Sequence, residues 1–227
     1  MAILVVLALA GTVVLEADVF VRRLAIQRTE EVLDGCVQLD EPRIDLGGYP
    51  VAVRALRGNL NDVRFTADSA ELAGIRLTDL RGQVRRVRFR VLGGIDDIHI
   101  DDADVSARLD EGDLEHVLHD LGLGGTVRIA DDAIQVQLDG VPTTIQLDID
   151  VDAGAAVIAL DGVLEPFIAL RFDIPGVTVD RIETLPGSLH VDATANGSPR
   201  DVACTAEDIV ASRLRSLARI AALIPGS

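Results

Sequence analysis

The chain has 227 residues, enough to bury a substantial core, and we expect a single β-rich domain rather than two small ones. Its 37 acidic and 21 basic residues give a formal charge of −16, which repels nucleic-acid phosphates, so we expect no nucleic-acid partner. Hydrophobic residues make up 48% of the sequence, unlike the composition of disordered proteins. The chain is therefore predicted to fold.

The N-terminal segment 1–17 is predicted to be a signal peptide or an N-terminal membrane anchor. The run from Ala2 to Leu15 is uncharged and mostly apolar. As a helix it would measure about 21 Å, whereas the hydrocarbon core of a bilayer is about 30 Å thick, so its length suits a signal peptide. Continuation of the helix through Val21 would make it an uncleaved anchor. Arg22 and Arg23 follow the run and no basic residue precedes it, so our hypothesis is that a basic segment lies upstream of Met1.

Residues 18–206 are predicted to form the domain itself. From Asp18 to Leu33 the apolar residues recur at helical intervals, which predicts an amphipathic helix that ends at Gly35. After Cys36 apolar and polar residues alternate with period two, which is typical of strands with one wet face. The clearest segments are 62–67, 86–91, 134–138 and 145–151.

Turns and irregularities punctuate these strands. Glycine-containing turns at short intervals favour antiparallel hairpins over parallel crossovers. The apolar positions shift phase between Ile100 and Ala103, which predicts a β-bulge near Asp101 and Asp102.

Three short helices are predicted among and after the strands, at Val51–Arg57, Asp113–Leu121 and Asp208–Leu223. The last is amphipathic, so residues 207–227 are assigned to a C-terminal amphipathic helix. Such a helix can dock on the domain or lie on a membrane surface, and we favour docking.

Cys36 and Cys204 are the only cysteines, which excludes a cysteine zinc cluster and a framework of several disulfides. Two alternatives remain. If the protein is exported, one bridge would tie the N-terminal segment to the last strand; otherwise both cysteines are buried free thiols.

The acidic residues and histidines do not form a recognisable metal site. Asp148, Asp150 and Asp152 alternate along one strand, but Ala153 and Ala159 stand where a calcium loop would need glycine and glutamate, so we interpret the acids as a solvated strand face.

Glu115, His116 and His119 share a predicted helix but lack nearby further zinc ligands in the sequence. No nucleophile elbow, phosphate loop or dinucleotide-binding turn occurs. We therefore expect no enzyme activity, no metal and no cofactor.

Several segments resemble a known family. They are Gly47-Gly48-Tyr49-Pro50, the stretch from Leu56 to Val63, the stretch from Gly74 to Leu80, and the turn and strand from Leu185 to Val191. Together they are similar to the LmeA-like phospholipid-binding proteins of actinobacteria, also called DUF2993, and the resemblance extends from about Val19 to about Val210. Tyr49 stands where the family is expected to have phenylalanine, and the C-terminal helix extends beyond the family core.

The resemblance implies an α+β fold of the tubular lipid-binding (TULIP-like) kind. In that fold a long helix is wrapped by a strongly curved antiparallel sheet, and the half-barrel or tube encloses an apolar tunnel for acyl chains. It further implies binding, with transfer as a further option, of a phospholipid of anionic or inositol type. The location implied is the cell envelope, on the periplasmic side of the cytoplasmic membrane, with the protein secreted or attached by its N-terminus. An envelope glycolipid-synthesis enzyme is a candidate partner.

Two groups of arginines could meet an anionic headgroup. Arg85, Arg86, Arg88 and Arg90 are interpreted mainly as the wet face of a strand that pairs with acids of the next strand, from Asp96 to Asp102. Arg54 and Arg57 are better headgroup candidates, because a short helix at the end of a curved sheet can line its mouth.

The lipid-binding residues predicted from the apolar strand faces and the resemblance are Tyr49, Pro50, Val53, Arg54, Arg57, Val63, Phe65, Phe89, Ile98, Ile100, Ile134, Val136, Ile149, Phe167 and Phe172. The alternative function is a structural envelope module that carries no ligand and docks on a membrane enzyme.

Overall fold

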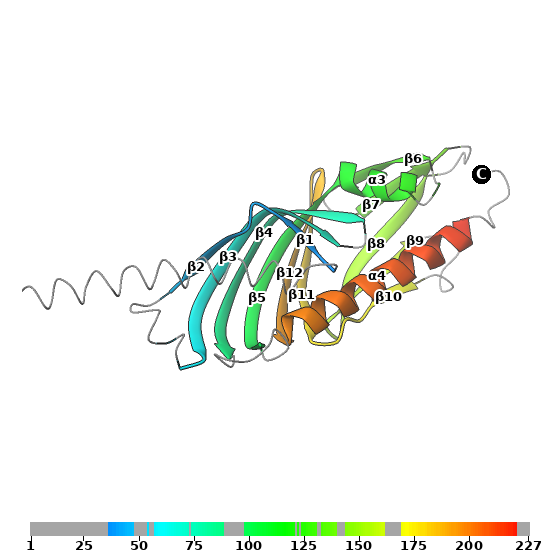
Figure 1. Cartoon of the computed structure of the whole chain (residues 1–227). Coiled ribbons are helices and arrows are strands. Elements are labelled where there is room, and N and C mark those ends of the chain that lie inside the picture. Colours follow the sequence, from blue (N-terminus) through cyan, green and yellow to red (C-terminus); the bar gives the residue numbers. More distant parts are fainter. Residues whose placement is uncertain are drawn as a thin grey trace, which may run out of the picture.

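A computed structural model describes residues 36–47, 54, 57–72, 74–88, 98–120, 122, 124–130, 133–139, 144–161 and 169–221 (Figure 1). The predicted N-terminal segment and the helix at 18–33 lie outside these residues. The same holds for five predicted lipid-binding residues: Tyr49, Pro50, Val53, Phe89 and Phe167.

The larger of two sheets has seven antiparallel strands, and its long strands bow along their length (Figure 1). The strand order is β1-β3-β4-β5-β12-β11, and β2 also pairs with β3 beside β1. The bounds are β1 Gln38–Asp40, β2 Arg43–Leu46, β3 Asn59–Leu72, β4 Ile75–Arg88, β5 His99–Asp110, β11 Val177–Leu185 and β12 Ser188–Gly197.

The smaller sheet is a five-stranded antiparallel meander, with the order β10-β9-β8-β7-β6. Its strands are β6 Gly125–Ala130, β7 Ala133–Leu138, β8 Ile145–Asp152, β9 Ala155–Asp161 and β10 Ala169–Phe172. The prediction of an antiparallel β-rich fold is confirmed. Among the described strands, the first and last strands of each sheet do not pair with each other, so neither sheet closes into a tube.

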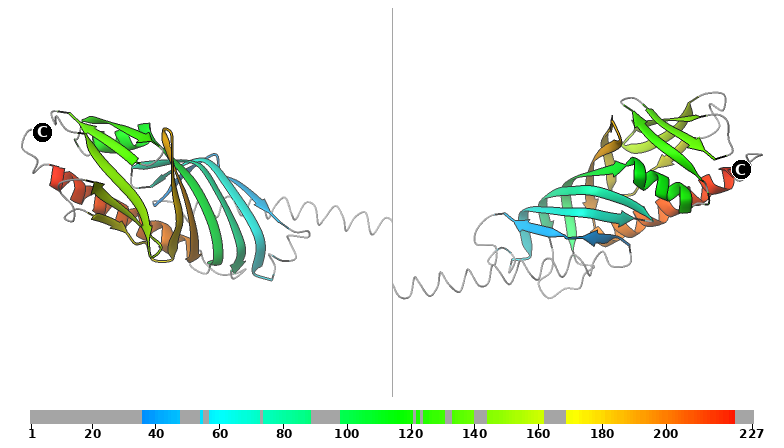
Figure 2. Two further views of the ribbon diagram at one scale, coloured as in Figure 1. Left: turned by 180° about the vertical axis from the view of Figure 1, so that it is seen from behind. Right: turned by 90° about the horizontal axis from the view of Figure 1, so that it is seen from above.

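The first described helix of some length, α3 (Glu111–Asp120), lies where the two sheets meet (Figure 2). It begins two positions before the predicted helix at Asp113. Its glutamates cap the free edge of β6, because Glu111 accepts a hydrogen bond from the Ile129 amide at 2.6 Å and Glu115 accepts one from the Val127 amide at 2.9 Å. Four residues of helix rise about 6 Å and two residues of strand about 6.6 Å, so the two carboxylates match alternate strand amides.

The C-terminal helix α4 (Pro199–Ala221) corrects the predicted start at Asp208. Proline is favoured at the first helical position, and the Val202 amide donates to the Ser198 carbonyl at 3.0 Å, so the helix begins directly after β12. Cys204 therefore lies in this helix, and its predicted position in the last strand is wrong. Neither α3 nor α4, the two long described helices, is both long and apolar enough to span a membrane.

The predicted β-bulge is confirmed. Arg86 pairs with Asp102 whereas Val87 pairs with Ile100, so Asp101 is an extra residue in β5. The insertion restores the apolar face of β5 after the phase shift.

The main hydrophobic core lies between the five-stranded sheet, α3 and one end of the larger sheet. Its buried residues are Val127, Ile129, Ile134, Val136, Leu138 and Leu189. The alternation predicted for 134–138 and 145–151 places apolar side chains into this core and leaves Asp148, Asp150 and Asp152 exposed on β8.

Candidate functional site

One face of the seven-stranded sheet carries apolar residues in rows that run across neighbouring strands. Strand register brings each row together, and Leu46 and Ile44 of β2 extend two of the rows beside Val63 and Phe65. The three rows nearest the start of β3 are Leu60-Val87-Ile100, Val63-Val84-Ala103-Ala195 and Phe65-Gly82-Val105-Ala193.

These rows differ from a closed core in their exposure. Val84 and Ala103 are buried, but the larger side chains around them, among them Val63, Phe65 and Val105, are only partly buried. Covering them further would stabilise a complex by about 25 cal/mol for each Å² removed from water. The face therefore has apolar area left with which a ligand can be held.

Phe65 and Gly82 form a tight cross-strand pair in the middle of this face. A Cβ placed on Gly82 would lie 2.0 Å from Cε1 of Phe65, so the ring occupies the space that a side chain would fill. The glycine lets the ring lie against the sheet backbone.

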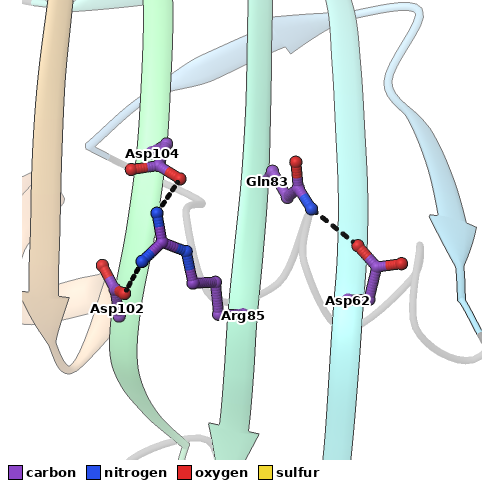
Figure 3. A network of polar contacts seen from close by, with 5 residues as sticks. All are labelled: Asp62, Gln83, Arg85, Asp102 and Asp104. Carbon is purple, nitrogen blue, oxygen red and sulfur yellow. Dashed lines mark hydrogen bonds and ion pairs between the residues drawn. The ribbon is translucent and has the colours of Figure 1, made fainter.

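The opposite face of the same sheet is polar and internally paired (Figure 3). Arg85 donates to Asp102 at 2.9 Å and to Asp104 at 3.0 Å, and Gln83 donates to Asp62 at 2.8 Å. Arg86 and Arg88 both reach Asp101. The predicted pairing of the arginine strand with the next strand is confirmed for these residues, while Arg90, Asp96 and Asp97 lie outside the described residues.

Arg54 and Arg57 lie close to one end of the apolar face. Arg57 is two residues ahead of β3, and the first residue of β3, Asn59, pairs with Arg88, the last residue of β4. Both arginines are exposed, and neither forms an ion pair with another described residue. The apolar row nearest to this end is that of Leu60.

Helix α4 and a disulfide bond lie next to the two sheets. The helix contacts β12 and β3 of the larger sheet and β10 of the smaller one. Cys204 forms a disulfide with Cys36, and their Cα atoms are 4.9 Å apart. Of the two alternatives for the cysteines, the structure shows the bridge.

The structure distributes the other predicted lipid-binding residues over both sheets. Ile98 and Ile100 are partly buried at the start of β5, near the Leu60 row. Ile134 and Val136 are buried in the main core, and Ile149 packs against it. Phe172, on β10, is partly buried in the five-stranded sheet. Their role in lipid binding stays a prediction.

Sequence reasoning missed several residues of the apolar face, namely Leu60, Val84, Val105, Ala193 and Ala195. Leu60 and Val84 are out of phase with the alternation at 62–67 and 86–91, because Asp62 has a positive φ and the pairing of β3 with β4 skips Asp62 and Arg85, so strict period two does not find them. The residues on β12 become neighbours of β5 only through the sheet order, which the local pattern does not contain. Within the described part of the chain, no three histidine, cysteine or acidic side chains are grouped as metal ligands.

Comparison with known proteins identifies the family of this chain. The family model for LmeA-like phospholipid-binding proteins matches residues 16–194, which include every strand described above except the last residues of β12. No curated protein and no solved structure matches the chain significantly. Because the match covers far more than half of the sequence, the chain belongs to the LmeA-like phospholipid-binding family.

Proposed function

We propose that this protein binds phospholipid by placing the acyl chains on the apolar face of the seven-stranded sheet. Membership of a phospholipid-binding family supports lipid as the partner. The single observation that supports this location is the set of rows from Leu60 to Ala193, whose larger side chains keep exposed apolar area. The main core offers no such area, because its residues are already buried against one another.

The predicted helix at 18–33 would complete the binding site. Its apolar stripe suits packing along the sheet face, with acyl chains between helix and sheet. Such an arrangement would enclose the chains in a tunnel as in tubular lipid-binding folds.

Arg54 and Arg57 would bind the headgroup. Their position at the end of the apolar face, together with their exposure, leaves both guanidinium groups available to a phosphate. Arginine binds phosphate through charged, bidentate hydrogen bonds, so the proposal favours an anionic or inositol-type phospholipid.

Transfer of a lipid between the protein and a membrane would cost little free energy. Moving an acyl chain from water to an apolar surface gains about 0.8 kcal/mol per methylene, but a bilayer shelters the chain equally well. The exchange is therefore nearly neutral for the chains, and the headgroup end would decide which lipid is preferred. No catalytic step is needed for this role.

We place the protein in the bacterial cell envelope, outside the cytoplasmic membrane, either secreted or held by its N-terminal segment. The Cys36–Cys204 disulfide supports an oxidising compartment, because disulfides seldom persist in the cytosol. The apolar segment at 1–17 is the feature that would direct export.

Lipid extraction of the purified full chain, followed by mass spectrometry, tests the proposal. We expect phospholipid in a fixed ratio to protein, and an anionic class among the species. Protein that is folded but lipid-free, and that takes up no lipid from vesicles, would contradict it. That result would favour the ligand-free module that docks on an envelope glycolipid-synthesis enzyme.

A further inference from the structure

The apolar face of the seven-stranded sheet continues from its partly exposed rows into the main core. Strands β12 and β5 present four pairs of residues to this face: Ala195 with Ala103, Ala193 with Val105, Val191 with Ala107, and Leu189 with Leu109. The first two pairs belong to the rows proposed to hold acyl chains, and the third pair continues them. The fourth pair joins the core, because Leu189 is one of its buried residues and Leu109 packs against it.

Burial changes at the fourth pair. Val191 is partly buried, whereas Leu189 is 4% exposed. Leu109 packs against the core and is still only partly buried, as expected for a side chain at the boundary between a packed core and an open face. Thr78 pairs with Arg108, so Leu77 of β4 lies beside Leu109 in the same row. We call Leu77, Leu109 and Leu189 the stop row.

Helix α3 and the smaller sheet close the face beyond the stop row. The helix follows β5 directly and contacts both β4 and β5, and it lies with the smaller sheet at this end of β5 (Figure 1). Leu114 and Leu118 of α3 pack against the same core as Leu109. An acyl chain that lies on the open rows therefore meets packed side chains at the stop row.

The open face has a definite length along β5. It begins at the row of Leu60 and Ile100, near Arg57, and the stop row follows four row spacings later at Leu109. At two residues for each spacing, this is about 26 Å along the strand. Contact with the leucine side chains takes about 4 Å, which leaves about 22 Å. With carbon–carbon bonds of about 1.5 Å and angles of about 111°, an extended chain advances about 1.25 Å for each carbon, so about eighteen carbons fit.

We propose that the stop row determines acyl-chain length, so that the face accepts phospholipids with chains of up to about eighteen carbons and selects against longer ones. This inference rests on the proposed function of the face and adds the class of lipid that it accepts. A chain that fits is sheltered as well by the face as by a bilayer. Methylenes beyond the stop row must fold back or stay in water, and each one left in water lowers the bound fraction about fourfold.

The test measures which chain lengths the full chain takes from vesicles. The vesicles contain equal amounts of three phosphatidylglycerols, with monounsaturated chains of fourteen, eighteen and twenty-two carbons, so that only chain length differs. The protein is separated from the vesicles, and its bound lipid is quantified by mass spectrometry. We expect the two shorter lipids in the proportion of the vesicles and the longest one depleted about tenfold or more.

Two variants move the stop in opposite directions. Leu109→Ala removes part of the stop row and should raise the share of the longest lipid about fivefold. Val191→Phe adds a ring one row earlier, at a partly buried position. It should shorten the face by about 6.6 Å, or about five carbons, and deplete the eighteen-carbon lipid relative to the fourteen-carbon lipid.

Leu147→Ala is the matched control. Leu147 is also a partly buried leucine that packs against the main core, but it lies on β8 of the smaller sheet. The substitution removes the same atoms as Leu109→Ala and should leave the length profile unchanged. A changed profile in this control would overturn the proposal, because general loosening of the core would then explain the effect of Leu109→Ala.

The remaining outcomes separate the stop row from the proposed function. Equal binding of all three lengths by the unmodified protein would overturn the stop row, as would an unchanged profile in Val191→Phe. The latter variant decides the matter even if Leu109→Ala does not fold. Loss of all lipid in Val191→Phe, whatever its length, would also overturn it, because Val191 would then lie at the entrance. Absence of bound lipid of any length in the unmodified protein would instead contradict the proposed function.

Discussion

The ring of Phe65 lies against Gly82 on the neighbouring strand, so closely that a Cβ on Gly82 would come within 2.0 Å of the ring. Both residues belong to the proposed acyl-binding face. Their contact determines how flat this face is at its centre, because a ring that lies on the backbone leaves the space above it open.

The first prediction follows from this contact. Gly82→Ala should destabilise the domain by about 1–3 kcal/mol, because the added methyl group displaces the Phe65 ring and the side chains that pack around the ring must also shift. In a Phe65→Ala background the same change should cost much less. Urea unfolding of the four proteins in this double-mutant cycle measures the difference. Equal costs in both backgrounds would show that the ring is not what fills the glycine site.

The second prediction concerns the edge cap on β6. Glu115→Ala should cost about 1–3 kcal/mol of unfolding free energy, because it leaves the buried Val127 amide without its acceptor. Glu115→Gln keeps an acceptor oxygen and should cost less. Asp120→Ala is the control on the same helix, because its contact with His116 is exposed and worth little. Thermal or urea unfolding of the three variants measures the costs, and a Glu115→Ala protein as stable as the control would contradict the cap.

The third prediction separates the headgroup end from the rest of the face. Arg54→Ala combined with Arg57→Ala should weaken the preference for anionic over zwitterionic phospholipid. Each charged hydrogen bond that is lost should reduce the binding free energy of the anionic lipid by about 1–3 kcal/mol. The total amount of bound lipid should stay nearly unchanged. A liposome-exchange assay measures both quantities. Arg85→Ala is the control, because Arg85 pairs with Asp102 and Asp104 on the polar face. Full anionic preference in the double variant would mean that the headgroup lies elsewhere, and the face from Arg85 to Arg90 would be tested next.

The fourth prediction distinguishes the core from the binding face by adding bulk to each. Val136 is 7% exposed in the main core, so Val136→Trp should lower the melting temperature by overpacking. Val105 is partly buried on the apolar sheet face, so Val105→Trp should leave the fold more stable than Val136→Trp and should reduce the amount of bound lipid. Calorimetry and lipid quantification on both variants test this, and the reverse order of effects would place the binding surface in the five-stranded sheet.

Local sequence patterns predicted the strands and their wet faces well, because alternation depends only on neighbours in the chain. They also located the bulge at Asp101, where the apolar phase changes. The start of α4 was wrong because the segment from Pro199 to Glu207 has small residues, such as Ala203 and Ala206, in place of a long apolar stripe. Small residues are sufficient there because the helix packs closely against the strand ends at Gly176 and Gly197.

The sequence predicts only some residues of the candidate site. The reason differs from the one that applies to α4. Alternation shows that Phe65 and Ile134 each face inward, but it does not show that they face different interiors. That distinction arises from the division into two sheets, with Phe65 on β3 and Ile134 on β7. It depends on pairings between distant segments such as β5 and β12, and no local period records those pairings.

The location of the acyl chain is the central claim, and photo-crosslinking tests it most directly. The full chain would be loaded with a phospholipid that carries a diazirine near the end of one acyl chain, irradiated, and mapped by peptide mass spectrometry. We predict crosslinks on the apolar face of the seven-stranded sheet, in peptides that contain Phe65, Val84 or Val105. Crosslinks confined to β6, β7 and β8 of the five-stranded sheet would contradict the account.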